Sequence, residues 1–306
     1  MAMHRLASVT IGVPNTAEAA DYYTEFGLQP VDDQWFATQD GGRQLHLVHA
    51  PARRLVEIEI GVDSSDDLAA AASQLTRLGI ESRSTATELT AVESVTGTRA
   101  VLRVQPRKTQ PVVAATAYNG PGRVERVGSR APGVLRADRV RPRRLGHAVL
   151  GTTDFATTAG FFRDGLGFKT SDLIGEIGVF LRCSTDHHNI LILSAPAAFL
   201  HHTSWQVDDI DEVGRGAAAM LENHPERHVW GLGRHHAGSN FFWYLKDPAG
   251  NFSEYYSDLD TIIDDQLWTP EVFEGAKGIF NWGPPPPPSF MHPEDLGALM
   301  AGSHAQ

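Results

Sequence analysis

Residues 145–169, LGHAVLGTTDFATTAGFFRDGLGFK, decide the fold, because residues 5–29, RLASVTIGVPNTAEAADYYTEFGLQ, follow the same pattern. Each stretch opens with the alternating apolar residues of a half-buried strand. Each then passes into a short amphipathic helix with two adjacent aromatic residues and closes on glycine. The repetition predicts a module that occurs in both halves of the chain.

A second repeat pairs residues 55–79, LVEIEIGVDSSDDLAAAASQLTRLG, with residues 200–224, LHHTSWQVDDIDEVGRGAAAMLENH. In both, a strand leads into a helix with acidic residues at its start. We therefore expect an α+β fold of two domains, each built from paired βαβββ modules whose strands curl around a central cavity. The expected divisions are an N-terminal domain (1–120), an Arg/Pro/Gly-rich linker (121–144), a C-terminal domain (145–282) that carries the candidate functional residues described below, and a proline-rich tail (283–306).

Composition excludes several classes of protein. The chain has 306 residues, enough for two cores, and a net charge of −11 that argues against a nucleic-acid partner. Its single cysteine, Cys183, excludes an internal disulfide and a cysteine-based metal site. No stretch is long enough for a membrane span and the start lacks the features of a signal peptide, so we expect a cytoplasmic protein with no membrane partner.

Two segments of biased composition, one rich in arginine and one in proline, are predicted to have structural roles. Residues 123–144 hold eight arginines against two acidic residues, and their glycines and prolines suggest a solvated linker or subunit contact. Residues 284–288 are five consecutive prolines, which predict a stiff polyproline II segment that guides the tail across its own or a neighbouring subunit.

Three candidate metal ligands, His147, His202 and Glu254, each lie in a strand-like segment of the second half. Taken singly, each is ordinary: a core histidine, a strand-edge histidine and one acid among 37. Together, two imidazoles and one carboxylate leave half of a metal's coordination sphere open, which suits Fe(II) enzymes that bind substrate and dioxygen together. A closed structural zinc site would need a fourth protein ligand.

The first half of the chain lacks this ligand set. When the repeats are aligned, the three ligand positions fall on Ser8, Glu57 and Val101. We therefore expect no metal site there and a structural role for the N-terminal domain.

Residues 231–258, GLGRHHAGSNFFWYLKDPAGNFSEYYSD, add further groups at related positions, and the pair His187 and His188 precedes them. Over most of residues 145–258 this pattern closely resembles the type I extradiol dioxygenases, the catechol meta-cleavage enzymes of the vicinal oxygen chelate superfamily. The shared signature is a GRH histidine, an aromatic strand, a D-P-x-G turn and a carboxylate ligand followed by an aromatic residue.

The resemblance implies a role for each residue of the site. His147, His202 and Glu254 would bind Fe(II), or less commonly Mn(II), and O2 would be the co-substrate. His188 would be the acid/base, although a register slip of one residue would select His187. The remaining two catalytic residues, which would hydrogen bond the substrate oxygens, are His235 and Tyr244.

The resemblance also implies a substrate and an assembly. Insertion of O2 next to the diol of a catechol would give a ring-opened, muconic semialdehyde-type product, and the protein would be a homo-oligomer of four or eight subunits. Acidic ring substrates call for a cationic pocket group, for which Arg182 and Arg234 are the candidates, so a neutral alkyl- or aryl-substituted catechol is favoured. The expected substrate-binding pocket walls are Val149, Phe180, Trp205 and Ala237.

Two alternatives follow from the same sequence. The first is another metalloenzyme of the superfamily, such as a glyoxalase, an epimerase or a thiol transferase, since fold alone does not decide activity. Such enzymes do not need the set of His188, His235 and Tyr244. The second is a metal-free protein that binds small molecules, which would have no reason to keep these ligands and proton-handling residues.

Overall fold

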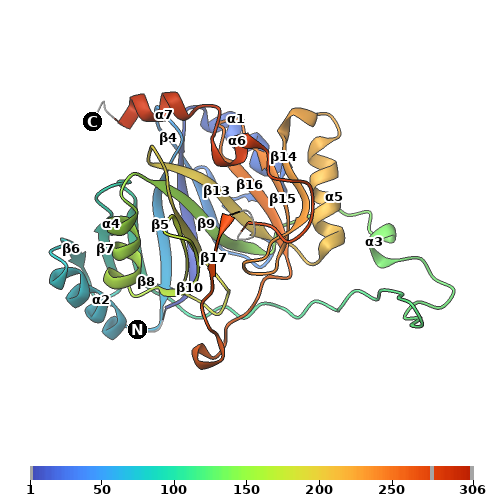
Figure 1. Ribbon diagram of the computed structural model, residues 1–306, viewed down its shortest axis with the longest axis horizontal. Coiled ribbons are helices and arrows are strands. Elements are labelled where there is room, and N and C mark those ends of the chain that lie inside the picture. Colours follow the sequence, from blue (N-terminus) through green and yellow to red (C-terminus); the bar gives the residue numbers. More distant parts are fainter. Residues whose placement is uncertain (1–2, 276–278, 304–306) are drawn as a thin grey trace.

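The computed structural model describes residues 3–275 and 279–303, and two large β-sheets form its framework (Figure 1). Three short stretches of the predicted domains and tail lie outside the described residues, namely 1–2, 276–278 and 304–306. None of the helices within the described ranges is long and apolar enough to cross a membrane.

The first sheet comes from the N-terminal half and has the strand order β2-β3-β4-β1-β5-β8-β7-β6. Its central strands β1 and β5 are antiparallel, and each is followed by one helix and three further strands. The elements are β1 (Met3–Val13), α1 (Thr16–Glu25), β2 (Gln29–Pro30), β3 (Trp35–Ala37), β4 (Arg43–His49), β5 (Arg54–Val62), α2 (Ser65–Arg77), β6 (Ser82–Ser84), β7 (Glu88–Val92) and β8 (Arg99–Val104).

The second sheet repeats this plan in the order β14-β15-β16-β13-β9-β12-β11-β10-β17. The central antiparallel pair is now β9 and β13. The elements are β9 (Arg144–Thr152), α4 (Phe155–Gly160) with the π-helical turn η1 (Phe161–Gly165), β10 (Lys169–Ile174), β11 (Gly178–Arg182), β12 (Ile190–Ser194), β13 (Phe199–Gln206), α5 (Ile210–Leu221), η2 (Pro225–Arg227), β14 (His228–Arg234), β15 (Phe241–Lys246), β16 (Phe252–Ser257), η3 (Asp265–Leu267) and β17 (Val272–Phe273). The predicted α+β fold with paired βαβββ modules is confirmed.

Local sequence explains where the helices of the modules begin. Asn15 accepts a hydrogen bond from the backbone N–H of Glu18 at the start of α1, and Asp154 does the same for Thr157 at the start of α4. Because a side-chain oxygen at this position satisfies an otherwise unpaired backbone donor, it stabilises the first turn. The repeated sequences thus encode the same strand-to-helix junction in both halves.

The two halves share one apolar core. The rings of Phe26, after α1, and Tyr255, on β16, are stacked with centroids 3.9 Å apart, and the Tyr255 hydroxyl donates to the Phe26 carbonyl at 2.6 Å. Tyr23 on α1 donates to the Asp247 carboxylate at 3.1 Å. The N-terminal half therefore packs directly against β16 of the second sheet.

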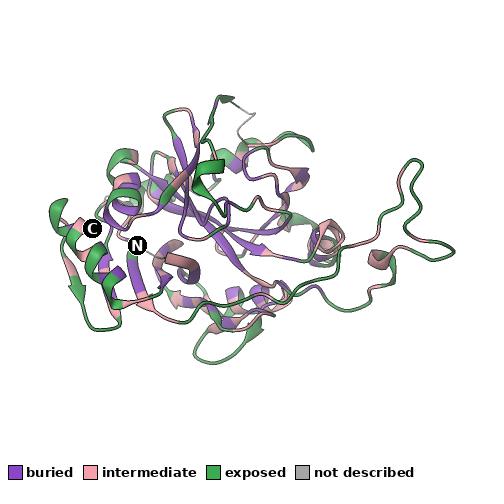
Figure 2. Ribbon diagram, turned by 90° about the horizontal axis from the view of Figure 1, so that it is seen from below, coloured by how far each residue is buried: buried purple, intermediate pink, exposed green. Residues whose placement is uncertain are grey.

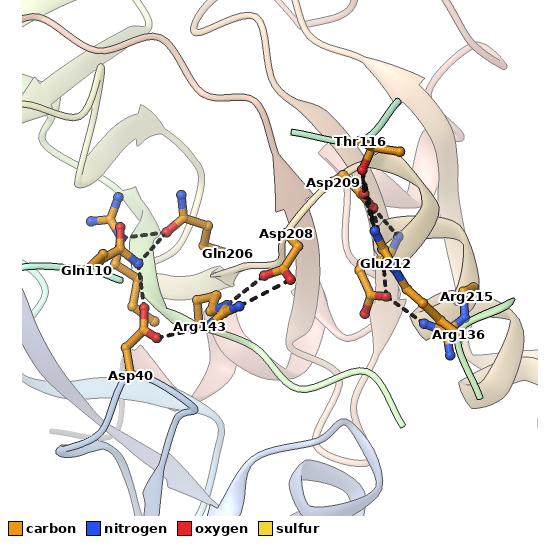
Figure 3. Close-up of polar contacts among 11 residues, drawn as sticks. Asp40, Gln110, Thr116, Arg136, Arg143, Gln206, Asp208, Asp209, Glu212 and Arg215 are labelled. Carbon is orange, nitrogen blue, oxygen red and sulfur yellow. Dashed lines mark hydrogen bonds and ion pairs between the residues drawn. The ribbon is translucent and has the colours of Figure 1, made fainter. Parts of the chain in front are cut away.

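The connection between the sheets is a long, largely irregular segment that runs out from the body beyond α5 and returns, with only the short helix α3 (Pro132–Leu135) in it (Figures 1 and 2). Figure 3 shows how it is fastened at its base. Arg136 forms ion pairs with Asp209 and Glu212 at 2.7 and 3.0 Å, and Arg143 pairs with Asp208 at 2.6 Å. The outer part of this segment, residues 112–135, is called the arm below.

The C-terminal segment 279–303, called the tail below, folds back over the second sheet and also contacts the N-terminal half. It contains α6 (Pro288–Met291) and α7 (Leu296–Ser303). Trp230 donates its ring N–H to the Pro284 carbonyl at 2.7 Å, and the buried Arg53 holds the Asp295 carboxylate at 2.7 Å. These contacts place Phe290 among the aromatic side chains of the second sheet.

Candidate metal centre and active site

Three adjacent strands of the second sheet bring the predicted ligands together. His147 lies on β9 opposite Ser204 of β13, and Ser204 in turn lies opposite Glu254 of β16. His202 precedes Ser204 by two positions and therefore shares its face of the strand. The expected convergence of three strands on one point is thus present.

The distances between the ligand atoms fit a divalent metal ion. His147 Nε2 and His202 Nε2 lie 3.1 and 3.6 Å from Glu254 Oε2, and 3.4 Å from each other. Ligands about 2.1 Å from a metal are about 3.0–3.5 Å apart for octahedral to tetrahedral angles. Because all three residues are buried and their atoms converge from one side, they could hold a metal with open positions.

Glu254 is prepared to act as an anionic ligand. The Ser204 hydroxyl donates to Oε2 at 2.6 Å and the Asn240 amide donates to Oε1 at 3.1 Å. Complete burial opposes ionisation, but the close contacts with the imidazoles of His147 and His235 outweigh it, so the pKa of Glu254 is lowered. The carboxylate is therefore charged at neutral pH, as metal binding requires.

His202 is held as the tautomer that leaves Nε2 free. His201 Nε2 donates to the Phe290 carbonyl at 2.6 Å, so in neutral His201 the other nitrogen, Nδ1, is an acceptor. His202 Nδ1 lies 2.7 Å from it and must donate. Burial lowers the pKa of His201 to about 4 and that of His202 well below its usual value, so both rings are neutral at pH 7.

His147 lacks such a partner. Its Nδ1 is buried and forms no hydrogen bond within the described part of the chain. Its ring packs on those of His188 and Tyr256, with centroids 4.2 and 5.6 Å away. His147 is therefore oriented by packing, whereas His202 and Glu254 are oriented by hydrogen bonds.

His188, the predicted acid/base, faces the site. It lines the cavity beside His147, whereas His187 is fully buried behind it. Burial and, next, the neighbouring His147 lower the pKa of His188 well below its usual value. Its imidazole is therefore neutral at pH 7 and able to accept a proton.

His235 and Tyr244 form a hydrogen-bonded pair on the other side. The two atoms of this pair, His235 Nε2 and the Tyr244 hydroxyl, are 2.9 Å apart, and His235 Nδ1 bonds to the Ile279 carbonyl in the tail. Because the carbonyl fixes the proton on Nδ1, the Tyr244 hydroxyl donates to Nε2. Burial and then the charge of Glu254 raise the pKa of Tyr244 well above its usual value, so it keeps its proton.

The side chains of His147, His202, His188, His235 and Tyr244 line one apolar cavity of about 250 Å³. Glu254 is fully buried against His147 and is not part of the cavity lining. Of the predicted wall residues, Val149, Phe180 and Ala237 line the cavity. Trp205 does not, and this expectation is corrected. An odd spacing from His202 and a register shift after Ser204 turn the indole into the apolar core, where it is fully buried.

The two arginines considered for acidic substrates also lie outside the cavity lining. Arg182 pairs with Asp265 at 2.6 Å and Arg234 pairs with Asp258 at 2.7 Å. Three residues that sequence reasoning missed close the cavity from the tail, namely Ile279, Phe290 and Met291. No local pattern in the tail marks them as part of a site.

The register also supports the comparison between the halves. On β1, Ser8 lies opposite Glu59, which lies opposite Val101 on β8, and Glu57 precedes Glu59 by two positions. These are the positions of His147, His202 and Glu254 in the second sheet. Glu57 instead pairs with the exposed Arg99 at 3.1 Å.

Comparison with known proteins places this geometry in a family context. The family model described as the Glyoxalase/Bleomycin resistance protein/Dioxygenase superfamily matches residues 5–125 and 144–255. Metapyrocatechase 2 of Cupriavidus necator is 37% identical over 176 residues, which are 56% of this chain and 55% of that protein. An iron-dependent extradiol dioxygenase of Rhodococcus jostii (strain RHA1) is 29% identical over 154 residues, which are 45% of this chain and 50% of that protein.

The chain thus spans about half the length of the curated relatives it matches. A solved structure extends the likeness further. The Mn(II)-bound glyoxalase from Novosphingobium aromaticivorans is 26% identical, with a TM-score of 0.75, and the alignment covers 99% of both chains.

Proposed function

The chain belongs to the Glyoxalase/Bleomycin resistance protein/Dioxygenase superfamily, and we propose that it is an extradiol dioxygenase that opens a catechol ring with O2. One observation carries the proposal. His147 and His202 of the buried His-His-Glu set line an apolar cavity together with His188, His235 and Tyr244, and Glu254 Oε2 lies 3.1 Å from His147 Nε2. Similarity to metapyrocatechase 2 supports the same activity.

We propose that His147, His202 and Glu254 hold Fe(II), with Mn(II) as the alternative. Both metals accept imidazole and carboxylate ligands. The R. jostii relative is named iron-dependent, while the N. aromaticivorans structure contains Mn(II). When bound, the metal supplies positive charge that favours loss of the diol protons and open positions for the reactants.

The chain's own residues then manage protons and orientation. His188, neutral and beside the ligand His147, accepts a proton from the diol and later returns it. Tyr244 keeps its own proton and, with His235, presents a polar edge to the substrate oxygens. The apolar walls and the tail exclude water around these groups.

The proposed substrate is a neutral catechol with an alkyl or aryl substituent, and the product a muconic semialdehyde-type compound. No lysine or arginine lines the cavity among the described residues, so an acidic ring substituent would have no charged partner. The volume of about 250 Å³ is at the small end of ligand pockets and favours a compact diol.

A second candidate function is a glyoxalase-type reaction, because the N. aromaticivorans glyoxalase aligns with the whole chain. It shares the requirement for a metal but consumes no oxygen. The N-terminal half, residues 1–120, we propose to be structural, since its equivalent positions carry Ser8, Glu57 and Val101.

We further propose that the arm binds a second copy of this chain. It exposes apolar side chains that find no cover on its own subunit, namely Val112, Val124, Val127, Val134 and Leu135. The arm carries three arginines and one glutamate, a net charge of +2, whereas the whole chain is −11. Arg130 in the arm, and Arg139 and Arg141 just after it, form no ion pair with any described carboxylate, which suits the acidic surface of another copy.

Sedimentation velocity tests this assembly. The wild type should sediment as an oligomer, and Val127→Asp with Val124→Asp should shift it to monomer. Val31→Asp is the matched control, because Val31 is 52% exposed outside the arm. A monomeric wild type would overturn the assembly.

The activity is tested by loading the protein anaerobically with Fe(II), adding 3-methylcatechol and admitting oxygen. A yellow ring-opened product formed with equal consumption of oxygen is the expected result. If bound iron yields neither product nor oxygen uptake with alkyl, aryl and acidic catechols, the dioxygenase proposal fails and the glyoxalase-type reaction becomes the better candidate.

A further inference from the structure

His188 is backed by a second histidine and a carboxylate. His188 Nδ1 lies 3.0 Å from His187 Nδ1, and His187 Nε2 lies 2.8 Å from Asp172 Oδ2. His187 is 0% exposed and Asp172 is 3% exposed, so water does not compete for these bonds. The three residues form a single line of contacts that ends at the cavity.

The hydrogen bonds fix the position of each proton along this line. A carboxylate only accepts, so His187 Nε2 must carry the proton that faces Asp172. Neutral His187 then has a lone pair on Nδ1, and His188 Nδ1 must donate to it. His188 Nε2 is left unprotonated, and no described side chain hydrogen bonds to it.

We propose that Asp172 and His187 are positioning residues that hold His188 as the tautomer whose Nε2 can accept a proton from the substrate. The inference rests on the proposed function of His188 as the acid/base. Neither residue touches the cavity, so each acts through its neighbour. A buried carboxylate orients a catalytic histidine in serine proteases in the same way, with one imidazole fewer.

The same line of contacts stabilises the charge that forms. When an O–H bond of the diol breaks, the oxygen keeps the electron pair and His188 Nε2 gains the proton. The resulting imidazolium already donates its Nδ1–H to His187. The negative charge of Asp172, one ring further back, favours that cation. Return of the proton from Nε2 to the product restores the starting tautomer.

Local structure holds the carboxylate and the rear imidazole in place. Asp172 lies on β10 at a point where the register against β11 shifts, and its side chain lies against His187. Its other oxygen, Oδ1, accepts the backbone N–H of Glu271 at 2.8 Å. Trp268 packs on the His187 ring with centroids 5.2 Å apart. On the opposite side, a Cβ at Gly238 would lie only 3.2 Å from His187 Nδ1.

Asp172→Asn tests the tautomer directly. The asparagine oxygen should stay on the Glu271 N–H, which turns its NH2 towards His187. His187 Nε2 then becomes the acceptor, its Nδ1 takes the proton, and His188 is left with its proton on Nε2. Because that nitrogen can no longer accept a proton, we expect kcat to fall roughly 10²–10⁴-fold while KM stays unchanged.

Nitrogen NMR reads the tautomers without relying on turnover. Full-length protein labelled with ¹⁵N-histidine and loaded with diamagnetic Zn(II) should show His188 protonated on Nδ1 and His187 on Nε2. The two signals are assigned by their loss in His188→Phe and His187→Leu. Asp172→Asn should exchange both assignments. Asp265→Asn, which alters an ion pair with Arg182 near the same strand, should change neither the tautomers nor kcat.

Should Asp172→Asn not fold, His187→Gln and His187→Leu replace it. Glutamine can still accept from His188 Nδ1 and should retain most of the turnover, whereas leucine cannot and should lose it. A wild-type His188 protonated on Nε2, or variants with unchanged kcat, would refute the positioning role of Asp172 and His187. Neither result would contradict the proposed dioxygenase activity. If His188 is protonated on Nδ1 and His187 on Nε2, but the protein cleaves no catechol, the proposed activity is refuted and the positioning of His188 by Asp172 and His187 is still supported.

Discussion

Replacing His201 should weaken metal binding although His201 is not a ligand. In His201→Phe, His202 Nδ1 loses its acceptor at 2.7 Å. Without metal, His202 can respond by moving its proton to Nε2, where Glu254 Oε2 lies 3.6 Å away. With metal bound through Nε2, the proton must return to Nδ1 and face apolar rings without a partner.

The penalty therefore falls on the metal-bound state alone. A buried donor left without an acceptor costs about 1–3 kcal/mol. At 1.4 kcal/mol for each factor of ten, this corresponds to about a 5- to 140-fold increase in Kd for the metal. Loss of partners behind metal-binding histidines costs about 10- to 100-fold in other proteins, which agrees with this range.

Anaerobic titration of the metal-free protein with Fe(II), in competition with a chromophoric chelator, measures this Kd. His201→Gln, which can still accept from Nδ1, should recover part of the affinity. His224→Phe is the matched control, because His224 is an exposed histidine paired only with Glu226. An unchanged Kd in correctly folded His201→Phe would refute the reasoning.

Three further predictions follow from the site and its supports. Glu254→Ala should abolish metal retention, whereas His188→Phe should keep the metal and lose turnover. Metal analysis of the dialysed proteins and measurement of oxygen uptake test both expectations, and an active His188→Phe would contradict the acid/base role. Phe290→Ala removes a ring that closes the cavity, so kcat/KM for an aryl-substituted catechol should rise relative to that for 3-methylcatechol. The loss of buried apolar surface should lower the free energy of unfolding by about 3–5 kcal/mol. Burial opposes ionisation of Asp209, but hydrogen bonds with Arg136, Thr116 and the Glu212 backbone outweigh it, so the pKa of Asp209 is lowered. The ionised carboxylate therefore stabilises the fold at pH values above the ordinary carboxyl pKa, and this stabilisation is lost as the pH falls towards the lowered pKa of the folded state. Thermal denaturation between pH 7 and pH 3 should show a steeper loss of Tm in the wild type than in Asp209→Asn, and equal slopes would exclude this contribution.

The features that could be predicted from the sequence are those that depend on periodicity. Alternation along each strand and the two internal repeats were enough to align Ser8, Glu57 and Val101 with the ligand positions, and the strand register agrees. The expectation that Trp205 lines the pocket disagrees with this alternation. A three-residue spacing from His202 already places it on the other face, and the irregular register after Ser204 keeps it there.

The supports behind the ligands could not be predicted, because they depend on contacts between distant segments. His201 bonds to the carbonyl of Phe290, and His235 bonds to that of Ile279. A backbone carbonyl carries no residue-type signal, so nothing in the tail sequence indicates either contact. Asp172 lies in the strand KTSDLI, whose first four residues are all polar, so its sequence gives no sign of a buried network, and its partner His187 becomes evident only in three dimensions.

The N-terminal half of the chain has a definable part in the site. Glu254 faces His147 and His202 from β16, so its neighbours Ser253 and Tyr255 face the opposite side. There the Tyr22 hydroxyl bonds to Ser253, the Phe26 ring stacks on Tyr255, and the Phe26 carbonyl accepts a hydrogen bond from the Tyr255 hydroxyl. Both contacts come from helix α1 or the residue that follows it. Since the two residues that flank Glu254, the proposed anionic ligand, are held by the first module, that module would be required to position this side chain although its own equivalent positions carry Ser8, Glu57 and Val101.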